Sequence, residues 1–209
     1  MYSLYVISNK PEKFAGISAS LNPERVNYFD GRYYGSFSKV VNNCIVACPT
    51  ETIIIMSDKV LPTQTHVRQT IDLLDRGYAF VALYRFAFFG FKKQLVRKIG
   101  FMDEGHVGGG YEDEDFYIRL IGNNLPIFVT EDVPYTPQPS SWNPEQARVY
   151  HFNKWKWDAT TSTLSRALPD TRLDYDLGPE QPVNWLSGRE TSYTPLRPVA
   201  QYFNMKINL

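Results

Sequence analysis

Apolar residues along the chain follow two different periods, and segments of the two kinds alternate. Short runs rich in β-branched and aromatic residues predict β-strands at residues 2–8, 25–29, 52–56, 78–84 and 126–130. Apolar residues spaced three and four apart predict helices at residues 36–47, 62–76 and 112–121. The run TIIIM at 52–56 does not alternate, as is typical of a strand buried on both faces of a largely parallel sheet. The pattern predicts an α/β fold, in which a mixed, mostly parallel sheet is flanked by helices.

The character of the sequence changes after residue 133, where prolines become frequent. We expect a loop-rich C-terminal segment over residues 134–209, with one short helix at 160–167. A long segment of this kind is typical of a functional lid or of a route into a further domain. Length and the absence of internal repeats favour a single domain over residues 1–209, with its α/β core at 1–133.

Composition narrows the class of partner. The 22 basic residues balance 22 acidic ones, so no overall field draws the protein to nucleic acid or to an anionic membrane. No apolar run approaches the roughly 20 residues of a membrane span, and the first ten residues lack the features of a signal peptide.

Cys44 and Cys48 lie four apart on a predicted helix, which is poor placement for a disulfide. Buried free thiols fit a reducing compartment, most simply the cytoplasm.

The stretch TIIIMSDKVLP, at residues 52–62, is the first that could carry chemistry. The buried strand delivers Asp58 and Lys59 to the carboxyl edge of the sheet, where open α/β sheets bind their ligands. Asp58 could hold a divalent metal and, through it, a diphosphate, while Lys59 could contact a phosphate directly. The alternative is that Asp58 only turns the chain before the next helix. Spacing alone leaves both interpretations open.

The second stretch, GGGYEDEDFYIRL, runs from Gly108 to Leu120 and places four carboxylates in succession. Acidic residues in the first turn of a helix are stabilised by its dipole, each by about 0.3–1 kcal/mol. Four consecutive helical positions cannot share one face, so only one or two of these side chains can point into a cleft. Asp115 and Arg119 have the spacing of a structural ion pair. The glycines would let the backbone pass close to a ligand, which a purely dipole-driven helix start does not require.

The third stretch, VYHFNKWKWD at residues 149–158, contains His151 among aromatic residues. A lone histidine in such surroundings is more often a core or surface residue than a metal ligand. His66 and His106 are weaker candidates, since neither follows a predicted strand.

Two of these stretches resemble the GT-A glycosyltransferases, a Rossmann-like fold family. Residues 36–62 resemble the donor-binding half of that family, and IGFMDE…GGGYEDEDFYIRL is similar to its GGFDE…GGEDxDxxxRL signature. The chain is also similar to viral glycosyltransferases that modify a capsid protein. The resemblance covers about residues 1–135 and implies a transferase that takes its sugar from a nucleotide donor.

The resemblance also implies roles for particular residues. Asp58 matches an Asp of the DxD motif that binds Mn²⁺ or Mg²⁺ and the UDP-sugar diphosphate, although Ser57 and Lys59 flank it where further Asp is common. His151 lies in the region that completes the metal site in several such enzymes. The positions that the resemblance associates with the donor nucleotide are Ser8, Asp30, Asn42, Asp58 and Lys59.

In inverting members of the family, the second carboxylate of the Glu-Asp pair is the catalytic base, which corresponds here to Asp113. It would take the proton of an acceptor hydroxyl, with Glu112 contacting acceptor or donor. The acceptor would be a glycan or glycoprotein. Two alternatives stay open: a nucleotidyltransferase, for which SNKPEKFAG after the first strand has too few glycines, and a non-catalytic module that binds a nucleotide sugar.

Overall fold

The computed structural model describes residues 1–21, 25–33, 35–137, 144–169, 177 and 206–209. Its centre is a six-stranded sheet with the strand order β2-β1-β3-β5-β4-β6. The strands are β1 (Tyr2–Ser8), β2 (Val26–Asp30), β3 (Thr52–Ser57), β4 (Phe80–Tyr84), β5 (Phe88–Lys92) and β6 (Ile127–Val129). Five of them correspond to the predicted strands, and β1 has the predicted bounds.

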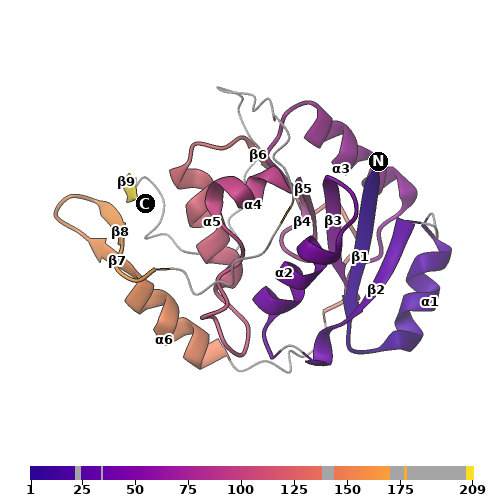
Figure 1. Cartoon of the computed structure of the whole chain (residues 1–209), viewed down its shortest axis with the longest axis horizontal. Helices are drawn as coiled ribbons and strands as arrows, with labels where there is room; N and C mark the ends of the chain where they lie inside the picture. Colours follow the sequence, from indigo (N-terminus) through magenta and orange to yellow (C-terminus); the bar gives the residue numbers. More distant parts are fainter. Residues whose placement is uncertain (22–24, 34, 138–143, 170–176, 178–205) are drawn as a thin grey trace.

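The sheet is mixed and mostly parallel, as the sequence predicts. β1 pairs in parallel with β2 and β3, and β4 pairs in parallel with β6. β5 is antiparallel to both of its neighbours, β3 and β4. In Figure 1 the chain begins at the upper end of β1, so the carboxyl edge of β1, β2 and β3 is the lower one.

Helices cover both faces of the sheet (Figure 1). One face packs against α2 (Phe37–Ala47), α4 (Gln94–Ile99) and α5 (Glu112–Gly122), and the other against α1 (Pro11–Ala19) and α3 (Gln64–Asp75). The strand β3 has no alternating polar residues because both of its faces are buried. Ile53 and Ile55 join the first core while Ile54 and Met56 join the second, and all four are fully buried.

Local sequence signals account for several helix ends. The Ser36 side chain accepts a hydrogen bond from the backbone N–H of Lys39, which caps the start of α2. Gly77 adopts a φ of 96° just beyond α3, in the left-handed conformation that glycine tolerates best. The helix α1 was not predicted. Pro11 occupies its first turn, where a missing N–H costs nothing.

A second, three-stranded sheet lies beside α5 and contains β7 (Trp155–Asp158), β8 (Thr163–Arg166) and β9 (Lys206–Asn208). The predicted helix at 160–167 is therefore wrong, since β7 and β8 form an antiparallel hairpin there. Asp158 accepts hydrogen bonds from Thr160 and Thr161, and Ser162 has a φ of 52°, so the chain turns where a helix would begin. The helix α6 (Pro144–Lys154) precedes the hairpin and was also not predicted.

Cys44 and Cys48 are free and buried, as expected. Across the described part of the chain, no helix combines the length and the apolar character that crossing a membrane demands.

Candidate active site

Three residues singled out from the sequence lie at the carboxyl edge of adjacent strands. Ser8 ends β1 and is paired in register with Asp30, the last residue of β2. On the other side of β1, Ile7 is paired with Ser57, so that Asp58 follows at the same level. The Asp58 backbone N–H donates to the Ile7 carbonyl oxygen at 3.2 Å, which ties the start of this loop to β1.

Asp58 is held by its neighbours on β1 and α1. The Ser8 hydroxyl donates to the Asp58 carboxylate oxygen Oδ2 at 2.7 Å, and the Lys13 ammonium lies 3.6 Å from the same oxygen. The Asp58 side chain is 11% exposed and that of Lys13 is 29% exposed. The carboxylate therefore already has a hydroxyl donor and a cation beside it.

The described residues do not fit a resident Mn²⁺ or Mg²⁺ site. Within the ranges that the structure describes, no three or more His, Cys, Asp or Glu residues are grouped to hold a metal ion. His151, the predicted second ligand, is fully buried, and its ring packs 5.3 Å from that of Tyr111 and 5.6 Å from that of Phe152. The cation beside Asp58 is an ammonium group from the protein itself.

Asp30 has a basic partner two residues along the chain. The Arg32 guanidinium donates to both carboxylate oxygens, with Nε 2.9 Å from Oδ1 and 3.0 Å from Oδ2. These hydrogen bonds lower the pKa of Asp30. The Asp30 side chain stays 18% exposed at the end of β2, where it and Arg32 can meet a ligand at the sheet edge.

The other two predicted donor-binding residues differ in their surroundings. Asn42 is fully buried in α2, where its side chain donates to the Met102 carbonyl and to Glu104 Oε1, both at 2.9 Å, and accepts from the Met102 N–H. It fixes the loop that leads to the acidic helix. Lys59 is half-buried in the turn after β3, and its carbonyl oxygen accepts from the Thr136 N–H at 2.8 Å.

The start of α5 faces the same edge of the sheet. The Ala79 N–H, just before β4, donates to the Pro126 carbonyl oxygen at 2.7 Å, which places the end of the α5–β6 connection at the amino edge of the sheet. The helix α5 therefore begins on the opposite, carboxyl side. Gly108, Gly109 and Gly110 have φ values of 82°, 77° and 101°, and Tyr111 has a φ of 70°. Four successive left-handed residues explain why glycine occupies three of these positions. The strain at Tyr111 is of the kind concentrated at functional sites.

The four acidic side chains at the start of α5 are not equivalent. Glu112, Glu114 and Asp115 are buried, with 7%, 3% and 0% of their surface exposed. Asp113 is half-buried, and its Oδ1 accepts from the Glu114 N–H at 3.0 Å. Asp113 is thus the acid of this turn that keeps the most contact with solvent.

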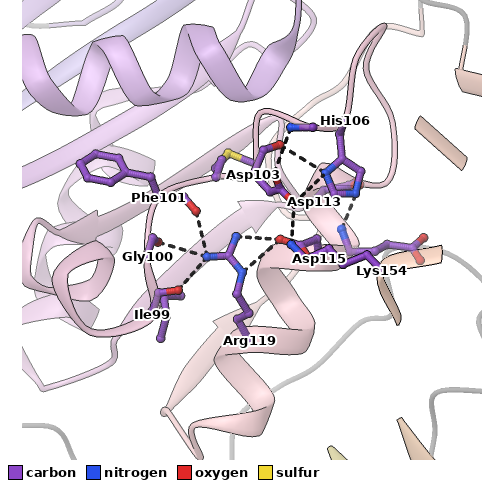
Figure 2. Close-up of polar contacts among 12 residues, drawn as sticks. Ile99, Gly100, Phe101, Asp103, His106, Asp113, Asp115, Arg119 and Lys154 are labelled. Atoms are coloured by element: carbon purple, nitrogen blue, oxygen red, sulfur yellow. Dashed lines mark hydrogen bonds and ion pairs between the residues drawn. The ribbon is translucent and has the colours of Figure 1, made fainter. Parts of the chain in front are cut away.

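Asp115 belongs to a buried ion network (Figure 2). Its Oδ2 accepts from the Arg119 guanidinium at 2.8 and 3.0 Å, which confirms the predicted pair. Its Oδ1 lies 2.5 Å from the Lys154 ammonium and accepts from the Trp155 indole N–H at 2.9 Å. Burial alone would raise the pKa of Asp115, but the charges of Arg119 and Lys154 hold that pKa well below its usual range.

The same network fixes the loop before α5. Lys154 also lies 2.6 Å from Oδ2 of Asp103, an oxygen that accepts from the Tyr150 hydroxyl at 2.9 Å. Arg119 donates to the carbonyl oxygens of residues Ile99, Gly100 and Phe101 at 2.8, 3.2 and 2.8 Å (Figure 2). Two buried carboxylates and two buried cations therefore join α4, α5 and α6.

Sequence reasoning did not identify Lys13 or Lys154. Lys154 stands 51 positions from Asp103 and 39 from Asp115, so no local spacing connects it with either. Lys13 lies on a helix that was not predicted. His106, the weaker histidine candidate, is fully buried beside this network, and burial lowers the pKa of its imidazole.

Comparison with known proteins leaves the chain without an assigned family. No protein-family model matches the sequence, and no curated protein sequence does. Among solved structures, the chain is similar to a mutant of Drosophila β-1,4-galactosyltransferase 7 in complex with manganese, UDP-Gal and xylobiose. The identity is 12% and the TM-score 0.45, over 71% of this chain and 72% of the other. A likeness at this level assigns neither an activity nor a ligand, and nothing found supports the closer similarity to viral capsid-modifying enzymes. What is established is the fold class, a mixed α/β sheet flanked by helices.

Proposed function

We propose that the protein is a glycosyltransferase that takes its sugar from a nucleotide donor, most simply a UDP-sugar, and transfers it to a glycan or glycoprotein. One observation carries the proposal: Ser8, Asp30 and Asp58 meet at the carboxyl edge of adjacent strands, and the helix that bears Asp113 begins on the same side. Nucleotides bind at this edge in open α/β sheets. The resemblance of GGGYEDEDFYIRL to a glycosyltransferase signature supports sugar transfer as the reaction.

Asp113 is the proposed base. As the acceptor oxygen bonds to the anomeric carbon, its proton passes to the Asp113 carboxylate, and the bond from that carbon to the donor diphosphate breaks. The sugar leaves the nucleotide with inversion at the anomeric carbon. The glycine run before Asp113 provides room for a sugar close to the backbone. Because the residues around Asp58 do not fit a bound metal, no step is assigned to one.

The proposal is tested by donor hydrolysis and donor binding. The protein should slowly hydrolyse a UDP-sugar without acceptor, and Asp113→Asn should lower that rate by about 10²–10⁴-fold because a general base is lost. UDP affinity should stay unchanged in this variant, and Asp72→Asn, on the exposed face of α3, serves as the control. UDP binding without any hydrolysis would instead identify a binding module. Full activity in Asp113→Asn would show that the base is assigned wrongly.

A further inference from the structure

Three lysines gather where β1 and β3 end. Lys10 is exposed two residues after Ser8, Lys13 lies in the first turn of α1, and Lys59 directly follows Asp58. The acidic residues of the same loops are Asp58 and the exposed Glu12. Although the whole chain carries no net charge, these two loops together carry an excess of positive charge.

The Lys13 ammonium supplies the positive charge beside Asp58 that a metal ion would otherwise supply. Its ammonium is 3.6 Å from Asp58 Oδ2, the oxygen that also accepts from the buried Ser8 hydroxyl at 2.7 Å. A divalent ion bound through this oxygen would stand close to the ammonium, and two like charges at such a distance repel strongly. The Lys13 ammonium beside Asp58 therefore disfavours a divalent ion at this oxygen.

We propose that Lys13 and Lys59 bind the donor diphosphate directly and that donor binding needs no divalent ion. An ammonium group is a compact point charge that pairs well with phosphate oxygens. The beginning of α1 adds the positive end of a helix dipole at the same place. This inference rests on the proposed function, since it assigns residues to the donor site of that reaction.

Calorimetric titration with UDP and with uridine tests the inference on the whole chain. Each ligand is titrated once with EDTA and once with MnCl₂, into the wild type, Lys13→Met and Lys92→Met. Lys92 is a matched control, because its ammonium pairs with Asp75 at 3.0 Å and is 25% exposed. It lies at the opposite edge of the same sheet, where Lys92 is paired with Thr52. Thermal unfolding of each variant confirms that it is folded.

The wild type should bind UDP with the same Kd, within about twofold, in EDTA and in MnCl₂. Lys13→Met should weaken UDP by about tenfold or more while leaving uridine affinity unchanged, because only the diphosphate contact is lost. Lys92→Met should bind both ligands as the wild type does.

UDP binding that requires Mn²⁺ would overturn the inference and leave the proposed function standing. Equal loss of UDP and uridine affinity in Lys13→Met would also overturn it, since that result indicates a structural role for the lysine. Absence of UDP binding under both conditions would refute the proposed function together with the inference.

Discussion

Lys154 joins two buried carboxylates from different parts of the fold, and its replacement by methionine should destabilise the protein strongly. The ammonium is fully buried, 2.6 Å from Asp103 and 2.5 Å from Asp115. Methionine matches the length of the apolar part of the lysine side chain but lacks the ammonium group and its charge. Each carboxylate would then stay in the interior without the cation that now lies between them.

The size of the effect follows from the geometry. At an effective dielectric constant of about 20, each of the two ion pairs is worth about 6 kcal/mol of attraction. Desolvation of the ammonium in the wild type cancels several kcal/mol of the attraction of the two pairs. The contacts of the carboxylates with Arg119, Trp155 and Tyr150 persist in the variant and reduce the loss further. Breaking a buried pair by removing one partner typically costs about 3–5 kcal/mol. The melting temperature should accordingly fall by about 6–20 °C in a chain of this size.

Urea unfolding followed by circular dichroism measures the change. Lys156→Met is the control, because Lys156 lies two residues further on and is exposed. The double variant Asp103→Asn, Lys154→Met should lose less stability than the two single variants added together, with a coupling of about 0.5–3 kcal/mol. An unfolding midpoint unchanged by Lys154→Met, with an unchanged slope, would refute the view that this network holds α6 against the core.

Three further results are expected. Burial lowers the pKa of His106 in the folded protein below its ordinary value of 6.5. The stability that the neutral imidazole contributes should therefore be complete above pH about 6.5 and fall as the pH drops through the lower, folded-state pKa. His106→Gln should flatten this loss when urea unfolding is measured between about pH 5 and 7.5. Asp58→Asn should bind UDP in EDTA as tightly as the wild type or more tightly, because it removes a negative charge beside Lys13; weaker binding by calorimetry would contradict this. Gly90→Ala should lower the melting temperature, since the added Cβ would lie 2.8 Å from Thr70 Cγ2, whereas Gly16→Ala, in open space within α1, should raise stability by about 0.5–1 kcal/mol.

The strands were predicted well because their signal is local. Residues 52–56 consist almost entirely of β-branched residues. Because the strand is buried on both faces, its apolar run is continuous and can be recognised from the sequence. The helix at 36–47 likewise carries its own start signal in Ser36. The meeting of Ser8, Asp30 and Asp58 also follows from the sequence once the strands are parallel, since parallel strands bring their carboxyl ends to one edge.

The hairpin and the ion network depend on contacts that are distant in sequence. Residues 160–167 contain apolar positions compatible with a helix, but β8 pairs with β7 on one side and with β9, some 40 residues further along, on the other. Tertiary pairing of this kind overrides local propensity. A buried lysine such as Lys154 is invisible to local patterns, because lysine is almost always found at the surface.

The acidic residues at the start of α5 differ in their surroundings and in their expected roles. Asp115 is neutralised by Arg119 and Lys154, so its place in the sequence is explained by packing. Asp113 is half-buried at the sheet edge, where the helix dipole favours it by about 0.3–1 kcal/mol and the neighbouring carboxylates oppose it by a similar amount. These opposing contributions nearly cancel, so Asp113→Asn should leave the unfolding midpoint almost unchanged. A large loss of donor hydrolysis with no loss of stability would therefore separate a catalytic carboxylate from one that only serves the helix.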